Sequence, residues 1–503
     1  MTSGIHHVTG LTRDVQANVD FYMGFLGLHL VKRTAGFEDA EQLHLFYGNA
    51  AGDPGTIVSF LVWQDGGSGR TGLGQVSEIA FAIPLHEMGD WITRALQQGL
   101  KISGPTRELG EPVLRLKDPD GLIVKLVGVE GGVAGVSRLH SVTILTDNSP
   151  DAVAMLGRFG YRRGPEEGAI TRMVSDTDVV DVREVSGYTP GIAGAGTIDH
   201  VALRAPDAAT VKAMFKTLGA AHGEVNMHDR KYFYSLYVRD AGGVLYEYAS
   251  DGPGFAVDEA ADALGKILFT PPGDDARARD LAVMLPQFAL PGEERWPQRR
   301  MLFSHRLYTP EGPNGRVFIL LHGTGGDETS LLPLAHRVDP HARLIGLRGR
   351  AVEEGRLRWF DRFSFDVFDQ ADIAKEAAAF EAFLDELSRF YGFDPAHAVF
   401  IGHSNGANFL AALLRLSPAL LQRVVLMRAQ EVLDPVPEGR STAKVLVLSG
   451  AQDVLVGYRA GGLVANLRAT GAEIDHRELA APHRMVDADI VAIREWVETT
   501  DGE

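Results

Sequence analysis

Three side chains with metal-ligand chemistry stand in strand-like runs where apolar residues would be expected. Glu247 interrupts the β-rich run at 244–246 in GGVLYEY, and His7 in GIHHVT and His200 in TIDHVAL lie near the starts of two other runs. Burying a carboxylate in a sheet is costly unless it is paired or binds a cation. Two imidazoles and one carboxylate are also the ligand set that holds non-haem Fe(II) with open positions. These residues therefore predict a metal site.

A second reactive set lies in the last 200 residues or so. A strand-like run leads into GHSNG and then into a helical stretch, the setting in which G-x-S-x-G exposes a nucleophile, here Ser404. Asp453 in LSGAQD and His483 in APHRM follow in the chain order of serine hydrolases of the α/β type. An earlier glycine-rich loop, HGTGG, predicts an oxyanion hole formed by the backbone N–H groups of Thr324 and Asn405.

Composition narrows the function classes. The chain has 503 residues, too many for one core, and it is 45% hydrophobic and 23% charged, as in ordinary globular proteins. Its formal charge of −17 argues against a nucleic-acid partner. It has no cysteine, so disulfides, thiolate ligands and thiol nucleophiles are excluded. Without a signal pattern or a long apolar run, we expect a cytoplasmic location and no membrane partner. The sequence does not decide whether the protein forms a homo-oligomer.

An internal repeat runs through the first half of the chain. Segments that begin with IHHV, VSEI, LHSV and IDHV follow one another at intervals of about 60 to 70 residues. A helical pattern and further strand-like runs follow each start, so every segment reads βαβββ. A lone histidine on a strand is more often a hydrogen-bonded core residue, but His7 and His200 occupy equivalent places in the first and fourth segments. The second and third segments have Glu78 and Ser141 there, and Lys125 suits an ion pair with Glu78.

The repeated unit resembles the vicinal-oxygen-chelate superfamily, which includes glyoxalases, extradiol dioxygenases and bleomycin-resistance proteins. This resemblance implies two paired modules, expected at 1–130 and at 135–290, the latter with a C-terminal tail. From about residue 299 the chain changes to continuous apolar runs, such as 317–321 and 445–448, separated by helical patterns. Such runs suit parallel strands buried on both faces. The predicted fold class is therefore α+β followed by α/β, with a doubly wound α/β-hydrolase domain at 298–503.

Longer motifs narrow the first resemblance. GIHHVTGLTRDVQANVDFY, IDHVALRAPD and DRKYFYSLYVRDAGGVLYEYASDGPGF are similar to those of hydroquinone-type ring-cleaving dioxygenases. The resemblance implies Fe(II), in preference to Mn(II), on His7, His200 and Glu247, with an aromatic substrate and O2. It also implies that four polar neighbours contact the ligands or the substrate: His6, Thr9, Arg230 and Tyr237.

The second half resembles the carboxylesterase/phospholipase family. The motifs that carry this resemblance are HGTGG, GHSNGAN and SGAQD, followed by a late histidine. The family implies hydrolysis of small carboxylic esters through an acyl-serine. One departure is Pro482, which stands before the candidate catalytic histidine where relatives usually have glycine.

Together these features predict a fused enzyme with two activities. An Fe(II)-dependent dioxygenase would open a substituted hydroquinone, and a serine carboxylesterase would hydrolyse the ring-cleavage product or a related small ester. The alternative is that the first half is a non-catalytic module that binds aromatic or quinone-like compounds, or a glyoxalase-type enzyme. In the binding-module case only the hydrolase domain would be active.

Overall fold

The computed structural model describes residues 4–222, 225–436 and 440–501. Two units share these residues. The first comprises Met1–Ala276 with Phe288–Arg295, and the second comprises Arg277–Gln287 with Trp296–Glu503. The domain limits predicted from the sequence, 1–130, 135–290 and 298–503, stay predictions, and each unit is described by itself.

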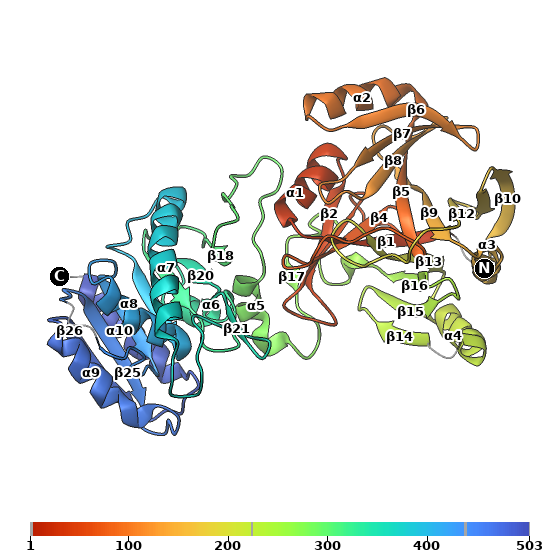
Figure 1. Ribbon diagram of the computed structural model, residues 1–503. Helices are drawn as coiled ribbons and strands as arrows, with labels where there is room; N and C mark the ends of the chain where they lie inside the picture. The colour runs from red at the N-terminus through yellow and green to blue at the C-terminus, as the bar shows by residue number, and fades with distance from the viewer. Residues whose placement is uncertain (1–3, 223–224, 437–439, 502–503) are drawn as a thin grey trace. The chain divides into compact units, whose positions relative to one another are not determined.

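The first unit contains successive segments with the order strand, helix and three strands (Figure 1). The first segment consists of β1 (Ile5–Thr12), α1 (Val15–Val19) continued by a π-helix (Asp20–Phe25), β2 (His29–Ala35), β3 (Leu43–Gly48) and β4 (Ile57–Val62). The second consists of β5 (Gln75–Pro84), α2 (Met88–Gln97), β6 (Ile102–Glu108), β7 (Glu111–Lys117) and β8 (Ile123–Val129). The third consists of β9 (Arg138–Thr146), α3 (Ser149–Arg158), β10 (Arg162–Glu167), β11 (Ile170–Val174) and β12 (Val179–Glu184). The fourth consists of β13 (Ile198–Ala205), α4 (Ala208–His222), β14 (Val225–Asp229), β15 (Phe233–Arg239) and β16 (Leu245–Pro253).

Two sheets are formed by these segments, and the pairing does not follow chain order. One sheet has nine strands in the order β14-β15-β16-β13-β1-β4-β3-β2-β17, which joins the fourth segment to the first. The other has eight strands in the order β10-β11-β12-β9-β5-β8-β7-β6, which joins the third segment to the second. The sequence had placed consecutive segments in one module. The antiparallel contact of β1 with β13 instead brings the two histidine-bearing segments into one sheet.

The connection between the units also differs from the prediction of a tail on the second module. β17 (Leu268–Phe269) pairs in parallel with β2 and so extends the first segment's edge of the nine-stranded sheet. The short helix α5 (Ala278–Met284) falls within the second unit. The apolar residues of this stretch are therefore divided between the two units.

The second unit is built on a seven-stranded sheet of order β18-β20-β19-β23-β24-β25-β26. Its strands are β18 (His305–Tyr308), β19 (Val317–Leu321), β20 (Arg343–Leu347), β23 (Val399–His403), β24 (Arg423–Met427), β25 (Lys444–Gly450) and β26 (Glu473–Leu479). All neighbours are parallel except β18, which runs antiparallel to β20. Its larger helices are α6 (Leu332–Val338), α7 (Gln370–Tyr391), α8 (Asn405–Leu416), α9 (Ala460–Ala469) and α10 (Asp487–Asp501).

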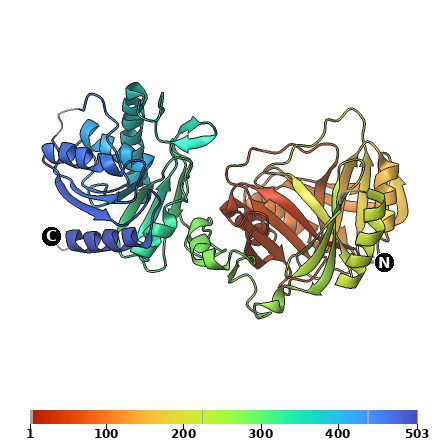
Figure 2. The ribbon, with the colours of Figure 1, turned by 90° about the horizontal axis from the view of Figure 1, so that it is seen from below.

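Alternating strand residues bury both faces of this sheet. Ile319 of β19 belongs to one apolar cluster, together with Phe380 of α7 and Leu410 of α8. The adjacent Phe318 belongs to another cluster, which includes Ile493 of α10. Because successive strand residues point to opposite faces, a continuously apolar strand requires helices on both sides, as Figure 2 shows for this unit.

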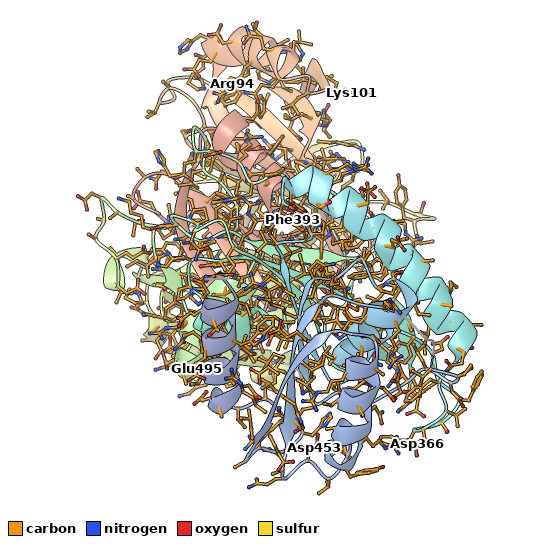
Figure 3. All side chains as sticks on the ribbon, turned by 90° about the vertical axis from the view of Figure 1, so that its left-hand side faces the viewer. Arg94, Lys101, Asp366, Phe393, Asp453 and Glu495 are labelled. Atoms are coloured by element: carbon orange, nitrogen blue, oxygen red, sulfur yellow. The ribbon has the colours of Figure 1, made fainter. Side chains whose placement is uncertain are left out.

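The loops at the carboxyl ends of these strands lie at one end of the second unit. Figure 3 shows Asp453, which follows β25, at the same end as Asp366, whereas Phe393 beyond α7 lies at the other end. A two-stranded hairpin of β21 (Ala351–Glu353) and β22 (Arg356–Arg358) follows β20. In α/β sheets, ligands bind beyond the carboxyl ends of the strands. Within the described parts of the chain, no helix is both long and apolar enough to span a bilayer.

Candidate active sites

The nine-stranded sheet brings together the three ligand-type residues that the sequence singled out. Nε2 of His200 lies 2.9 Å from Oε2 of Glu247, and Nε2 of His7 lies 3.2 Å from the same oxygen. The two Nε2 atoms are 3.4 Å apart. All three residues are buried, so the cluster lies inside the protein and not on its surface.

Strand register explains why residues so distant in sequence converge. His7 of β1 lies opposite Ala202 of β13, and Ala202 lies opposite Glu247 of β16. Residues in one row across a sheet share a face, and so do residues two positions apart on a strand. His200, two positions before Ala202, therefore lies on the face that carries His7 and Glu247.

Each of the three residues has a partner that fixes its orientation. Oδ2 of Asp199 lies 2.7 Å from Nδ1 of His200, and the Ser235 hydroxyl donates to Oε1 of Glu247 at 2.5 Å. Nδ1 of His6 lies 2.9 Å from Nδ1 of His7. Partners of this kind hold metal-binding imidazoles and carboxylates in place. The sequence prediction named His6 among them but missed Asp199 and Ser235.

Electrostatics at the centre favour positive charge. Burial alone would lower the pKa of His200, but hydrogen bonds to Asp199 and Glu247 raise it to about 9. Burial alone would raise the pKa of Glu247, but the neighbouring His7 and His200 hold it well below its usual range. The carboxylate is therefore ionised and faces a position where a cation is stabilised.

The donor set fits a metal ion. Ligands at about 2.1 Å from a metal, on one face of an octahedron, stand about 3.0 Å from one another, close to the three separations observed here. Among the residues the structure describes, His7, His200 and Glu247 form the one group of three or more such residues whose ligand atoms come this close. A fourth protein ligand is absent from that group, so a bound metal would keep open positions.

Polar side chains line the neighbouring strands β1, β3 and β4. Oγ of Ser59 lies 2.9 Å from Oγ1 of Thr9 and 3.0 Å from Nε2 of His44. From the sequence, His44 is interpreted as a structural or surface residue. In the structure it is close enough to the centre that burial, followed by the charges of His7 and His200, lowers its pKa to about 3. His44 is therefore neutral at physiological pH.

Aromatic rings and one cation complete this site. The ring of Phe233 lies 5.1 Å from the ring of His6 and 5.2 Å from that of His7. The ring of Tyr237 lies 5.6 Å from that of His200. The guanidinium of Arg230 lies 5.5 Å from the centre of the Tyr237 ring and pairs with Glu38 at 2.9 Å.

The eight-stranded sheet has an ion pair at the corresponding place. Lys125 of β8 lies opposite Ala80 of β5, just as Glu247 lies opposite Ala202. Its Nζ is 2.9 Å from Oε2 of Glu78 and 3.1 Å from Oγ1 of Thr143, and both Lys125 and Glu78 are buried. The predicted Lys125–Glu78 ion pair is confirmed.

In the second unit, Ser404, His483 and Asp453 form a hydrogen-bonded chain. Nε2 of His483 lies 2.9 Å from Oγ of Ser404, and Nδ1 lies 2.9 Å from Oδ2 of Asp453. Burial alone would raise the pKa of Asp453, but hydrogen bonds from His483 and from two backbone N–H groups lower it. An ionised Asp453 orients the imidazole to accept the serine proton.

The turn that carries the serine depends on its glycines. Ser404 has φ 50° and ψ −114°, an unfavourable region for a residue with a side chain, between β23 and α8. A Cβ on Gly402 would lie 2.7 Å from the backbone nitrogen of Ala407, and one on Gly406 would lie 2.3 Å from the carbonyl oxygen of Leu321. The strained turn exposes the serine hydroxyl at the carboxyl end of the sheet.

The candidate oxyanion loop is braced by residues from the following hairpin. Arg358 donates to Oγ1 of Thr324 at 3.0 Å. The side-chain oxygen of Asn405 accepts from the backbone N–H of Trp359 at 2.8 Å, and the Trp359 indole donates to the carbonyl of His322 at 2.9 Å. Thr324 and Asn405, the predicted donor pair, both border the same pocket as Ser404.

A buried ion pair holds the loop of the candidate catalytic histidine. Both oxygens of Asp489 accept hydrogen bonds from Arg428, at 2.9 and 3.0 Å, and neither side chain is exposed. Nε of Arg428 also donates to the carbonyl of Pro482 at 2.8 Å. Pro482 stands where related sequences usually have glycine. The hydrogen bond from Arg428 holds its carbonyl in place directly before His483.

Ser404 and His483 open into a pocket of about 480 Å³. Small-molecule sites commonly have volumes of about 300 to 1,000 Å³. Its wall includes Phe365, Phe368 and Leu455, together with three arginines. The pocket therefore has room for a small organic substrate beside the serine.

Comparisons with known proteins agree with this description of the first unit. Residues 4–126 match the model of the Glyoxalase/Bleomycin resistance protein/Dioxygenase superfamily. MhqE of Bacillus subtilis (strain 168), named a ring-cleaving dioxygenase, is 33% identical over 302 residues, 57% of this chain and 99% of that protein. The chlorohydroquinone/hydroquinone 1,2-dioxygenase of Sphingobium indicum is 29% identical over 289 residues, 52% of this chain and 89% of that protein.

A solved structure of another kind is also similar to part of this chain. The crystal structure of a carboxylesterase from Mesorhizobium loti has 38% sequence identity with this chain. It covers 39% of this chain and 94% of its own, with a TM-score of 0.38. With 57% of its length matched to nearly the whole of MhqE, the chain belongs to the ring-cleaving dioxygenases of the glyoxalase superfamily.

Proposed function

We propose that the chain joins two enzymes: an Fe(II)-dependent dioxygenase that opens hydroquinone rings, and a serine carboxylesterase that hydrolyses the ring-cleavage product or a related small ester. The observation that carries the first activity is the buried convergence of His7, His200 and Glu247. The second rests on the hydrogen-bonded chain from Ser404 through His483 to Asp453.

His7, His200 and Glu247 would hold the ferrous ion. When bound, the ion supplies the redox chemistry that lets O2 react with an electron-rich ring. Two imidazoles and one carboxylate suit this ion and leave positions for substrate and O2. The absence of a second carboxylate from the described ligand group favours this reading over a glyoxalase-type isomerase.

The surrounding side chains would orient the ring and manage its protons. Phe233 offers an apolar face beside His6 and His7. A para-hydroquinone can give the metal only one oxygen, so other groups must hold its second hydroxyl. Tyr237 and the Arg230 guanidinium are placed to donate hydrogen bonds to an anionic oxygen. His44, held neutral by burial, can accept a hydrogen bond from a substrate hydroxyl.

The second activity follows from the serine site. The hydroxyl oxygen of Ser404 would attack the ester carbonyl while Nε2 of His483 takes its proton. The backbone N–H groups of Thr324 and Asn405 would stabilise the oxyanion. His483 then gives its proton to the departing alcohol, and water attacks the acyl-serine by the reverse sequence, releasing the acid.

Two substitutions in the full chain test the assignment. After anaerobic loading with Fe(II), O2 uptake is followed with hydroquinone and chlorohydroquinone, and ester hydrolysis is followed separately. Glu247→Gln should abolish O2 uptake and leave hydrolysis intact, with Glu184→Gln, an exposed carboxylate of the third segment, as the matched control. Ser404→Ala should lower hydrolysis by roughly 10⁴-fold or more and leave O2 uptake intact, with Ser417→Ala as its control.

Different failures point to different errors. An iron-loaded wild-type protein that takes up no O2 with any hydroquinone would overturn the dioxygenase and favour an aromatic-binding module. Loss of both activities in the Ser404 variant would contradict two independent sites. Persistent hydrolysis in that variant would remove the serine mechanism.

A further inference from the structure

The pocket beside Ser404 is positively charged in an acidic protein. The chain carries a formal charge of −17, yet the charged residues that line this pocket are three arginines: Arg356, Arg358 and Arg362. No aspartate or glutamate belongs to the described lining. A pocket for neutral esters needs no such cluster, since apolar walls and an oxyanion hole suffice.

Two of the arginines are already engaged. Arg358 is buried, donates to Thr324, and lies 3.4 Å from Glu353. Arg362 pairs with Glu353 at 2.8 Å. Glu353 and, at longer range, Asp361 are the carboxylates that act on this cluster. Two carboxylates therefore oppose three guanidinium groups, which leaves an excess of positive charge at this wall.

The third arginine is available to a ligand. Arg356 is exposed at the pocket wall. Among the described residues it makes no close ion pair, although its charge acts on Glu353, which lies opposite it in the hairpin. It begins β22, two residues before Arg358, so the two side chains leave the hairpin on the same face. Its stem lies over Gly325 of the oxyanion loop: a Cβ built on that glycine would be 3.8 Å from Cδ of Arg356. The hairpin thus carries a cation to the edge of the oxyanion loop.

We propose that the serine site takes a carboxylic ester that also bears a carboxylate, and that Arg356 binds this carboxylate. This rests on the proposed esterase activity and names its substrate class. Arg358 and Arg362 contribute by holding the hairpin and by keeping the potential of the wall positive. An arginine pairs with a carboxylate through two parallel hydrogen bonds, which orients the substrate as well as attracting it.

Ring opening is a reaction class that supplies such a molecule. When O2 cleaves the bond between a hydroxyl-bearing carbon and a neighbouring carbon, one oxygen atom is added to each. The hydroxyl-bearing carbon becomes a carboxylate. A neighbour that bears hydrogen becomes an aldehyde, whereas a neighbour that bears an alkoxy group becomes an ester. An alkoxy-substituted hydroquinone opened at that bond therefore yields a six-carbon chain with a carboxylate at one end and an ester at the other.

A pair of substrates, one with a free carboxylate and the other with that carboxylate esterified, tests the proposal. Monomethyl adipate and dimethyl adipate have the same six-carbon chain and the same leaving alcohol, and hydrolysis is measured as methanol released by the full-length protein. We expect kcat/KM for the monoanion to exceed that for the diester at least tenfold, with a preference that weakens as ionic strength rises. Arg356→Gln should reduce this preference about tenfold, mainly through KM for the monoanion, and Arg356→Lys should restore part of it.

Arg389→Gln is the matched control, because it removes one arginine from an exposed place on α7 outside the pocket. It should keep the wild-type preference. Equal hydrolysis of both adipates by the wild type, or the same loss of preference in both glutamine variants, would overturn the proposal and leave the esterase standing. Hydrolysis of neither ester would overturn the esterase as well.

Discussion

Ser235 offers a test of the metal centre that does not touch a ligand. Its hydroxyl donates to Oε1 of Glu247 at 2.5 Å, whereas Oε2 is the oxygen that faces His7 and His200. Ser235 is fully buried, so in Ser235→Ala water has little access to replace the hydroxyl. A hydrogen bond to a charged group is worth about 1.5 to 3 kcal/mol. Losing it should weaken Fe(II) binding by about 10- to 100-fold.

The assay is an anaerobic titration of metal-free full-length protein with Fe(II) in competition with a coloured chelator. Ser77→Ala is the control, because Ser77 is also a buried strand serine but donates to the backbone carbonyl of Thr143 in the other sheet. We expect a higher Kd for the Ser235 variant alone, with ester hydrolysis unchanged. If both variants bound Fe(II) within twofold of the wild type, Ser235 would not orient the ligand.

Two further predictions concern the eight-stranded sheet. Lys125→Met should destabilise the first unit by about 3 to 5 kcal/mol in urea unfolding, because it leaves Glu78 buried without its ion pair. Adding Glu78→Met should recover much of the lost free energy of unfolding. No recovery in the double variant would refute the pairing. Burial alone would raise the pKa of Glu111, but His140 and Arg172 lower it to about 2 from an ordinary 4.5. The stabilisation that ionised Glu111 gives to the folded state is therefore complete above pH 4.5 and fades as the pH falls toward 2. Glu111→Gln should cost about 1 to 2 kcal/mol at pH 7, after allowance for partial exposure, and progressively less below pH 4; a cost independent of pH would contradict this.

Local patterns in the sequence were sufficient to predict that the first half consists of βαβββ segments. They could not show which segments share a sheet. Strand pairing depends on edges and faces that meet only in three dimensions, and β1 could pair with β5 or with β13 without any change in its own apolar pattern. The weak strand β17 was hidden for a related reason, since its two residues have no period to detect.

In the candidate sites, too, sequence patterns were sufficient for some residues and not for others. Ser404, Asp453 and His483 stand in recognisable motifs, so the sequence sufficed to name them together as candidates, and the structure places them in one hydrogen-bonded chain. Asp199 and Ser235 act through a neighbouring side chain, and no spacing rule marks them. An aspartate directly before a strand histidine is a usable signal in retrospect. Arg356 was overlooked because an arginine in a hairpin is usually a solvated residue.

The two sheets of the first unit meet the same electrostatic requirement by different means. Each sheet contains a buried carboxylate: Glu247 in one sheet and Glu78 in the other. The register is equivalent, with Glu247 opposite Ala202 and Lys125 opposite Ala80. In the eight-stranded sheet the chain itself supplies the cation, since the Lys125 ammonium neutralises Glu78 at 2.9 Å. The nine-stranded sheet has glutamate at the position of that lysine, so its central positive charge must come from protonated imidazoles or from a metal ion. An ion held by three ligands satisfies both imidazoles and the carboxylate at once. Three differences at equivalent register positions therefore separate the structural ion pair from a site able to bind a metal ion: Lys125 against Glu247, Glu78 against His200, and Ser141 against His7.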